Sequence, residues 1–260
     1  MAVMSTNTER RSRRQTTKLW RVPVRVIQQL TPRMTRITVG GDDLADFVSA
    51  GTDQNVMLYF YPDDVTLPEP LTLQAARAMW SQVRPQTRTY TIGRHDPERN
   101  EVDFDFVLHD AGLASDWVKR VRPGDPVIFV GPSPVYRPDP AADWHLVAGD
   151  ETALPAIAAI LRELPAGART LVFVEVEDAA EEQSLPTDAD AVITWLHRAA
   201  GATLAPAVTG ADLPDGQVDA WLAGERTAML TLRGHLLDEC GYPRSQVRPT
   251  TYWRRGEPGN

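Results

Sequence analysis

Residues 88–94, Arg-Thr-Tyr-Thr-Ile-Gly-Arg, and residues 101–108, Glu-Val-Asp-Phe-Asp-Phe-Val-Leu, decide the fold of the first half of the chain. In the second stretch apolar residues alternate with acidic ones, and this period of two predicts a strand with one buried face. Residues 95–97, His-Asp-Pro, are typical of a turn, so the two stretches together predict a β-hairpin.

The first stretch also has the side chains of a ligand site. At strand spacing, one face would carry Arg88, Tyr90, Ile92 and Arg94, and the other would carry Thr89, Thr91 and Gly93. An aromatic ring can stack on a flat ligand, and a guanidinium can bind phosphate. An ordinary strand with an exposed arginine and a half-buried tyrosine also explains these residues, because short motifs often match by chance.

Further short strands surround the hairpin. The pattern predicts strands at residues 20–30, 34–39, 55–61 and 127–130, and short helices at residues 73–83 and 113–121. Many short strands with closely spaced turn signals are typical of a small antiparallel β-barrel. We therefore expect residues 17–135 to form a β-barrel domain.

The pattern changes at Trp144, where apolar strands begin to alternate with helices. Strands are predicted at residues 145–148, 170–176, 191–196 and 218–223, and helices at residues 153–164 and 226–239. Continuous apolar strands between helices are typical of a parallel sheet that is covered on both faces. We expect residues 144–260 to form an α/β domain, which the proline-containing segment 136–143 joins to the barrel.

Composition limits the functions open to the chain. The 260 residues carry a net charge of −8, and an acidic body argues against general binding to nucleic acid or anionic membranes. The basic segment at residues 1–16 is expected to be a poorly ordered tail, with contact to an acidic partner as the alternative.

A single cysteine, Cys240, cannot form an internal disulfide or hold an iron–sulfur cluster. No apolar run is long enough to span a membrane and no signal peptide is evident, so we expect a cytoplasmic protein, and we expect it to be a monomer.

Two other stretches carry candidate binding residues. In residues 109–117, His-Asp-Ala-Gly-Leu-Ala-Ser-Asp-Trp, Gly112 gives a flexible entry to a helix whose first amides can bind a pyrophosphate. Residues 149–156, Gly-Asp-Glu-Thr-Ala-Leu-Pro-Ala, follow a predicted parallel strand, where ligands bind in α/β sheets, although they lack the Gly-x-Gly-x-x-Gly spacing. Simple helix capping, and acidic residues that complement a helix dipole, are the plainer explanations of these two stretches.

In combination these motifs resemble the siderophore-interacting proteins, which are flavin-dependent ferric-siderophore reductases of the ferredoxin-reductase-like superfamily. The resemblance runs in matching order from about residue 17 to residue 256, and it rests on residues 88–91, 105–109, 112–117, 149–156, 221–225 and 252–256. It implies a flavin-binding antiparallel β-barrel followed by a nicotinamide-binding domain built on a parallel sheet. FAD would be the cofactor, and NADH or NADPH the electron donor.

The resemblance also implies roles for individual residues. Arg88 would contact the FAD phosphates, Tyr90 would stack on the flavin, and Thr91 would lie near the N5 edge of the flavin. Tyr90 and Thr91 are therefore the catalytic candidates. The other cofactor-binding candidates are Ile92, His109, Gly112, Ala114 and Ser115 around FAD, and Asp150, Thr152, Gly224 and Glu225 around the nicotinamide.

An anionic ferric chelate would need cations beside the flavin. The candidates are Arg94, Arg248, Arg254 and Arg255. Gly93 departs from the family, which often has a basic residue at this position, and Arg94 is the candidate substitute. The siderophore itself holds the iron, so no metal site built from protein side chains is expected.

The implied function is electron transfer from NADH or NADPH, or from a ferredoxin, through FAD to ferric siderophores, which releases ferrous iron in the cytoplasm. Flavin suits this role because a reduced nicotinamide gives two electrons as hydride, whereas ferric iron accepts one. Acidic residues at 175–182 favour NADH, because a carboxylate can bind a ribose diol and repels a 2′-phosphate, although the family suggests NADPH. A solvated acidic loop explains these residues equally well. The alternatives are a general flavin reductase, the reductase partner of an oxygenase, and a flavin-containing protein that only binds ferric chelates.

Overall fold

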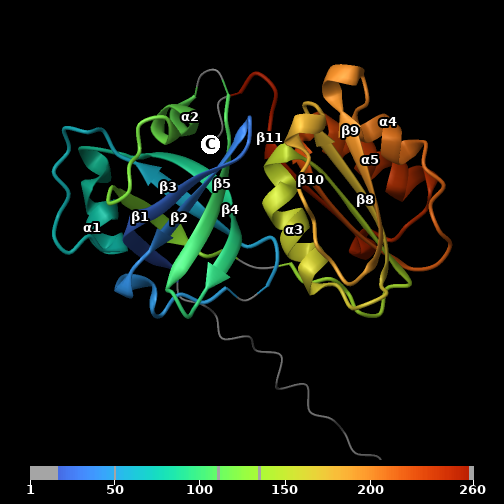
Figure 1. Ribbon diagram of the computed structural model, residues 1–260, viewed down its shortest axis with the longest axis horizontal. Helices are drawn as coiled ribbons and strands as arrows, with labels where there is room; N and C mark the ends of the chain where they lie inside the picture. The colour runs from blue at the N-terminus through green and yellow to red at the C-terminus, as the bar shows by residue number, and fades with distance from the viewer. Residues whose placement is uncertain (1–16, 50, 110–111, 134–135, 258–260) are drawn as a thin grey trace, which may run out of the picture.

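The computed structural model describes residues 17–49, 51–109, 112–133 and 136–257, so the predicted tail at residues 1–16 lies outside the described residues. The described residues form two halves that lie side by side (Figure 1). The first half of the chain is a closed antiparallel barrel, and the second is a parallel sheet with helices on both faces. The predicted fold class, a β-barrel followed by an α/β half, is confirmed.

Six strands close the barrel in the order β1-β2-β5-β4-β3-β6. Their bounds are β1 Lys18–Thr31, β2 Met34–Gly40, β3 Asn55–Phe60, β4 Gln86–Asp96, β5 Glu101–Val107 and β6 Pro126–Gly131. Two short helices, α1 Leu73–Ala78 and α2 Leu113–Val118, pack against the barrel. Apolar side chains fill the interior, and the fully buried ones include Ile37, Val39, Phe104 and Phe129.

The hairpin of β4 and β5 contains an irregularity that the sequence pattern does not predict. Ile92 lies opposite Phe104, but Arg94 lies opposite Asp103, so Gly93 is an extra residue in β4. An extra residue turns each following side chain to the other face of the sheet. Arg94 therefore does not share the face of Ile92, and that expectation is wrong.

On the face of β5 that points away from the barrel interior, the aspartate side chains are buried and pair with arginines. Asp103 and Asp105 are only 1% and 7% exposed. Arg94 donates a hydrogen bond to Asp103 at 2.7 Å, and Arg36 donates two to Asp105 at 2.7 and 2.8 Å. Strand β5 thus has two buried faces, which its alternating apolar and acidic residues do not indicate.

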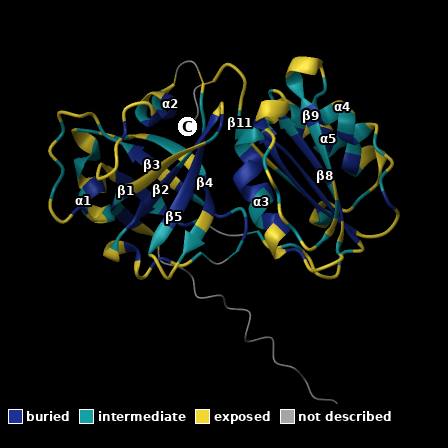
Figure 2. Cartoon of the chain, viewed as in Figure 1, coloured by how far each residue is buried: buried dark blue, intermediate teal, exposed yellow. Residues whose placement is uncertain are grey.

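The second half is a five-stranded parallel sheet in the order β11-β10-β7-β8-β9. The strands are β7 Trp144–Asp150, β8 Arg169–Val176, β9 Asp190–His197, β10 Val218–Glu225 and β11 Val247–Trp253. Helix α3 Leu154–Glu163 packs on one face, and α4 Leu204–Thr209 and α5 Arg226–Gly234 pack on the other. The central strands are buried between these helices (Figure 2).

The remaining helical segments are short. A π-helical segment, His235–Glu239, continues α5. Single 3-10 turns are Asp42–Leu44, Met79–Ser81, Glu151–Ala153, Ala179–Glu181, Arg198–Ala200 and Arg244–Gln246.

The sequence pattern does not predict strand β11 or helix α4. Strand β11 contains Pro249 among polar residues, and it is an edge strand, where proline is tolerated. Helix α4 has six residues and contains Pro206, so it is too short for a clear helical period. Both elements nevertheless contribute residues to the cleft described below.

Contacts between the two halves set the barrel against the sheet. Arg162 of α3 donates to the carbonyl oxygen of Gly93 at 2.9 Å. Glu181 accepts a hydrogen bond from the Arg33 amide at 3.0 Å and another from the Thr31 hydroxyl. These contacts place the carboxyl ends of β7 and β8 beside the barrel, and a cleft lies between the halves.

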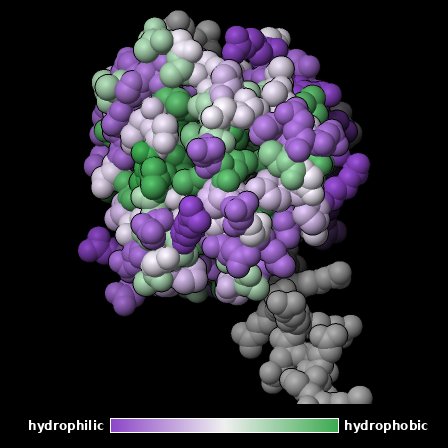
Figure 3. All heavy atoms as spheres, turned by 90° about the vertical axis from the view of Figure 1, so that its right-hand side faces the viewer, coloured by the Kyte–Doolittle hydropathy of each residue, from purple (hydrophilic) through white to green (hydrophobic). Residues whose placement is uncertain are grey.

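Figure 3 shows the surface on the side of the α/β half. Apolar residues gather there in small areas between polar ones. Val192 on β9 and Leu230 on α5 are exposed large apolar residues of this half, at 61% and 53%. Among the described residues, none of the helices combines the length and the apolar character needed to cross a membrane.

Candidate functional site

The candidate site is a cleft of about 1490 Å³ between the barrel and the parallel sheet. Typical single-ligand pockets measure roughly 300–1,000 Å³, so this cleft has room for more than one ligand. The predicted site residues that line it are Arg88, Tyr90, Thr91, His109, Gly112, Ala114, Ser115, Asp150, Thr152, Glu225, Arg254 and Arg255. The structure thus brings together residues from motifs that lie far apart in the sequence.

Strand β4 supplies an aromatic ring and a cation to the barrel wall of the cleft. The Tyr90 ring packs on Phe106 with a centroid distance of 4.3 Å, and burial raises the pKa of its phenol, which therefore stays neutral. The Arg88 guanidinium donates to the carbonyl of Thr87 at 2.7 Å. Among the described residues, no carboxylate forms an ion pair with Arg88, so its charge is available to an anionic ligand.

The start of helix α2 forms the next part of this wall. Gly112 has a φ of 143°, and among the described residues other than its chain neighbours no atom lies within 4 Å of the position that a Cβ would take. No side chain of the described part of the chain caps the helix. Ser115 is buried, and its Oγ accepts a hydrogen bond from the His109 amide at 3.0 Å, which ties the preceding loop to the helix.

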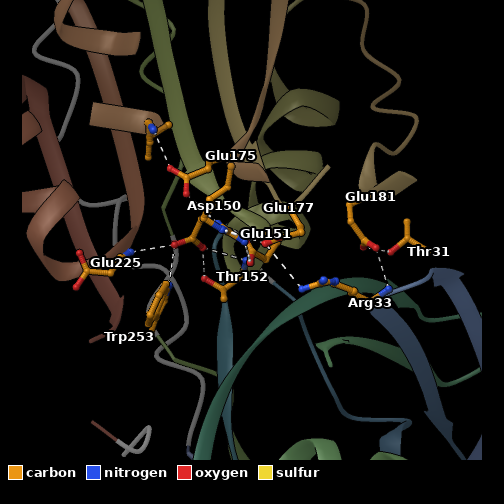
Figure 4. A network of polar contacts seen from close by, with 12 residues as sticks. Thr31, Arg33, Asp150, Glu151, Thr152, Glu175, Glu177, Glu181, Glu225 and Trp253 are labelled. Carbon is orange, nitrogen blue, oxygen red and sulfur yellow. Dashed lines mark hydrogen bonds and ion pairs between the residues drawn. The ribbon is translucent and has the colours of Figure 1, made fainter. Parts of the chain in front are cut away.

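Asp150, at the end of β7, is a buried acceptor that joins three strand ends on the sheet side of the cleft (Figure 4). Its Oδ1 accepts from the Thr152 amide at 3.0 Å and from the Thr152 hydroxyl. Its Oδ2 accepts from the Glu225 amide at 2.9 Å and from the Trp253 indole nitrogen at 2.7 Å. Burial, with a smaller effect from Glu151, raises the pKa of Asp150 to about 6, while the bonds from Thr152 and Trp253 oppose that rise.

Gly224 does not line the cleft, and the close approach of Asp150 accounts for the glycine at this position. A Cβ at position 224 would lie 2.5 Å from Asp150 Oδ2, and the φ of 150° also disfavours other residues. Ile92 likewise lies behind the cleft, in the barrel core. The structure therefore gives both residues a packing role next to the lining residues.

Replacing Asp150 by asparagine is expected to destabilise the fold. The asparagine amide nitrogen would face either the two donors of Thr152 or those of Glu225 and Trp253. Each buried donor left without an acceptor costs about 1–3 kcal/mol, so the free energy of unfolding should fall by at least this amount in chemical denaturation. The control is Asp190→Asn at an exposed position, which should change stability by less than about 0.5 kcal/mol. Equal stability of the two variants would contradict the role of Asp150 as a shared acceptor.

Glu151, Glu175 and Glu177 lie close together on the sheet side (Figure 4), and all three contact Arg198. Arg198 contacts Glu151 at 2.6 Å, Glu175 at 2.8 Å and Glu177 at 3.3 Å. Burial alone would lower the pKa of Arg198, but the bonds to Glu151 and Glu175 raise it overall, so the guanidinium stays charged. Arg33 of the barrel also pairs with Glu177, at 3.8 Å, and its amide donates to Glu181, so four carboxylates and two guanidinium groups leave a formal charge of −2 in this part of the cleft.

The four candidate substrate arginines separate into two pairs. Arg94 contacts Asp96, Glu101 and Asp103 at 3.0, 3.6 and 2.7 Å and does not line the cleft. Arg248 contacts Asp219, lies 5.4 Å over the ring of Tyr136, and does not line the cleft either. Arg254 and Arg255 line the cleft; Arg254 contacts Glu257 at 3.2 Å, and both side chains are exposed.

Sequence reasoning missed two contributors to the site. Asp53, in the barrel segment before β3, accepts hydrogen bonds from two residues of the α/β half, and no periodic pattern marks it. Trp253 belongs to a motif that the resemblance uses, but its bond to Asp150 depends on the unpredicted strand β11. Among the described residues, no group of three or more His, Cys, Asp or Glu side chains is placed to hold a metal ion.

A closed antiparallel barrel that faces a parallel sheet across one cleft defines a two-domain protein of the ferredoxin-reductase-like fold class. Comparison with known families is more specific. Residues 23–136 match the siderophore-interacting FAD-binding domain, and residues 142–256 match the siderophore-interacting protein family. The chain belongs to the siderophore-interacting protein family, and its barrel is the FAD-binding domain.

Relatives with assigned names agree with this family. The ferric vibriobactin reductase ViuB of Vibrio cholerae is 30% identical over 88% of this chain and 86% of its own length. The NADPH-dependent ferric-chelate reductase of Escherichia coli is 29% identical over 87% of this chain and 89% of its own length. A crystal structure of a siderophore utilization protein from T. fusca superimposes with a TM-score of 0.79 at 34% identity, covering 94% of this chain and 95% of that one.

The residues of the barrel wall fit FAD. Arg88 offers a cation that no described carboxylate occupies, and Gly112 lies at the start of α2, which no described side chain caps. Cations and free helix amides are the groups that bind phosphates. Tyr90 offers an aromatic ring that is already held in place by Phe106.

Proposed function

We propose that this protein is an FAD-dependent reductase that passes electrons from a reduced nicotinamide dinucleotide to ferric siderophores and so releases ferrous iron in the cytoplasm. One observation carries the proposal. A single cleft is lined both by Arg88, Tyr90 and Thr91 of the FAD-binding barrel and by the 150–152 turn at the carboxyl edge of the parallel sheet. Ligands of open α/β sheets bind at that edge, so donor and cofactor would meet in one space. The names of the V. cholerae and E. coli relatives support the same reaction class.

Different residues of the cleft would bind FAD and the nicotinamide. Arg88 and the amides at the start of α2 would bind the phosphates of FAD, and Tyr90 and Thr91 would orient its flavin. When bound, FAD supplies the exchange between a two-electron donor and a one-electron acceptor. Asp150, through its hydrogen bonds with Thr152, Glu225 and Trp253, would hold the strand ends on the sheet side of the cleft in the positions that bind the nicotinamide.

Two of the four predicted substrate arginines line the cleft, and this supports a role for them in substrate binding. Arg254 and Arg255 follow β11 and are exposed at the cleft, whereas Arg94 and Arg248 are occupied elsewhere by carboxylates. We therefore assign the contact with an anionic ferric chelate to Arg254 and Arg255. The donor is proposed to be NADH, because the wall formed by Glu151, Glu175 and Glu177 is negative.

Anaerobic mixing tests the proposed function. The purified protein reconstituted with FAD should bleach when NADH is added and recolour when a ferric siderophore is added with a ferrous-iron trap present. Bleaching without recolouring would indicate a different electron acceptor, as expected for a general flavin reductase or an oxygenase partner. No bleaching with either nicotinamide would indicate reduction by a ferredoxin or a role in binding only.

Substitution of Arg255 by glutamate is expected to raise the KM for anionic ferric chelates about tenfold or more, because a cation at the cleft is replaced by an anion and each 1.4 kcal/mol is a factor of ten. The KM for NADH should change much less. The matched control is Arg244→Glu, an exposed arginine of the same half that does not line the cleft. Equal increases in both KM values, or equal effects of the two variants, would refute the assignment of Arg255.

A further inference from the structure

Asp53 of the barrel half binds two strands of the α/β half. Its Oδ2 accepts a hydrogen bond from the indole nitrogen of Trp221 on β10 at 3.0 Å, and its Oδ1 accepts one from the Tyr252 hydroxyl on β11. Asp53 has a φ of 49°, in the left-handed region. Such a backbone conformation persists only where surrounding contacts hold it, and it is frequent at functional sites.

Tyr252 continues this chain of contacts to Thr91. The Tyr252 oxygen lies 3.5 Å from the Oγ1 of Thr91, which is a long contact, and both residues line the cleft. Thr91 is itself buried, at 6% exposure. The three residues Asp53, Tyr252 and Thr91 therefore connect a barrel loop, the last strand and the predicted flavin-contacting strand.

The chemistry of the groups fixes the direction of these hydrogen bonds. An indole N–H can only donate and an ionised carboxylate can only accept, so Asp53 receives both of its bonds. Burial raises the pKa of the Tyr252 phenol, so it keeps its proton and gives it to Asp53. Its oxygen can then only accept from Thr91, so the Thr91 hydroxyl proton points to Tyr252 and the Thr91 oxygen is left as an acceptor.

Burial raises the pKa of Asp53 overall, and the bonds from Tyr252 and Trp221 limit that rise. Both of its oxygens face donors, and hydrogen bonds to an ionised carboxylate are stronger than those to a neutral acid. The contacts therefore favour the ionised carboxylate.

We propose that Asp53 is a positioning residue that acts through Tyr252 to make Thr91 a hydrogen-bond acceptor toward the cleft, and that this raises the reduction potential of the bound FAD. The inference rests on the proposed placement of Thr91 at the N5 edge of the flavin. Flavin N5 carries a proton only in the reduced form, so an acceptor beside it stabilises reduced FAD, whereas a donor stabilises oxidised FAD.

Asparagine at position 53 provides a near-isosteric test, because it reverses the direction of the hydrogen bonds from Asp53 through Tyr252 to Thr91. The Trp221 indole N–H still requires an acceptor, so the asparagine oxygen must face Trp221 and its NH₂ must face Tyr252. The Tyr252 hydroxyl then donates to Thr91, and the Thr91 proton turns toward the cleft. Asp53→Asn should therefore lower the midpoint potential of bound FAD.

The experiment is a reductive titration of FAD-loaded wild type, Asp53→Asn, Tyr252→Phe and the double variant against a reference dye, without nicotinamide or ferric chelate. We expect each single variant to lower the ratio of reduced to oxidised FAD at a given potential about tenfold, which is about 30 mV for a two-electron couple. Tyr252→Phe loses one oxygen and keeps the packing, so it tests the inference even if the Asp53 variant folds poorly. The midpoint potential of the double variant should equal that of Tyr252→Phe alone, because Asp53 acts on the flavin only through Tyr252.

A merely structural role for Asp53 gives a different result. FAD retention or stability would fall while the midpoint potential stayed at the wild-type value, and that outcome overturns the inference. Additive shifts of the two single variants would also overturn it. Because the titration uses neither donor nor substrate, the inference can fail while the anaerobic reductase assay succeeds, and the reverse also holds.

Discussion

Replacing Arg88 by alanine is expected to weaken FAD binding about 10- to 100-fold while leaving the stability of the protein without FAD nearly unchanged. Hydrogen bonds to charged groups contribute about 1.5–3 kcal/mol, and each 1.4 kcal/mol is a factor of ten in affinity. The stability is expected to hold because the Arg88 guanidinium contacts only the neighbouring Thr87 carbonyl among the hydrogen bonds of the described residues. Titration of the apoprotein with FAD, followed by flavin fluorescence, measures the affinity.

The matched control for this prediction lies on the same strand. Arg94→Ala removes the same side chain from β4, but Arg94 is outside the cleft and pairs with Asp103, Asp96 and Glu101. We expect this variant to lose stability, because the buried Asp103 would lose its 2.7 Å ion pair and keep the longer 3.9 Å contact with Arg36, and to bind FAD normally in its folded form. If both variants keep wild-type FAD affinity, the assignment of Arg88 to the FAD phosphates is wrong.

NADH is expected to exceed NADPH in kcat/KM by at least about tenfold. The 2′-phosphate of NADPH would approach a part of the cleft where four carboxylates outnumber two cations; the carboxylates are Glu151, Glu175, Glu177 and Glu181, and the cations are Arg198 and Arg33. Two like unit charges about 4 Å apart repel by about 1 kcal/mol in water and about 4 kcal/mol near a protein surface. A ribose diol has no charge and can donate to a carboxylate, so NADH avoids this repulsion.

Glu177→Gln tests the cause of that preference. Glu177 has the longest of the three contacts with Arg198, at 3.3 Å, and its other ion pair, with the exposed Arg33, measures 3.8 Å, so its charge can be removed with little loss of structure. The ratio of kcat/KM for NADH to that for NADPH should fall about three- to tenfold in this variant, because one negative charge is gone. Glu163→Gln, which alters an ion pair with Arg137 away from the cleft, should leave the ratio unchanged. A wild-type preference for NADPH would show that the dinucleotide does not place its ribose at this wall.

The hairpin of β4 and β5 shows how far local pattern can be trusted. The alternation in residues 101–108 indicates a strand with a buried apolar face, and the structure confirms it with Phe104 and Phe106 in the barrel core. The pattern does not reveal the extra residue at Gly93, because a bulge depends on which residues the partner strand places opposite. Nor does it reveal that Asp103 and Asp105 are buried, since Arg36 comes from strand β2 and Arg94 faces Asp103 only because of the extra residue at Gly93.

The candidate site divides in a similar way. Motifs at residues 88–91, 112–115 and 150–152 could be found in the sequence, because each combines unusual residue types in a short stretch. The contribution of Asp53 could not, because its importance comes from Tyr252 and Trp221, which are 199 and 168 residues away in sequence. The four arginines carry the same charge in the sequence, and only the folded chain separates Arg254 and Arg255 from the two that carboxylates occupy elsewhere.

By itself, the sequence determined the two architectures, the order of the binding motifs and the family, because periodicity, turn residues and short motifs are properties of neighbouring residues. The tertiary structure alone decided which polar groups face the cleft, which charges are already paired, and in which direction the Asp53–Tyr252–Thr91 hydrogen bonds run. Those properties depend on distances between residues that are remote in the chain. A charge or a hydroxyl group is available for chemistry only when no other part of the fold has already bound it.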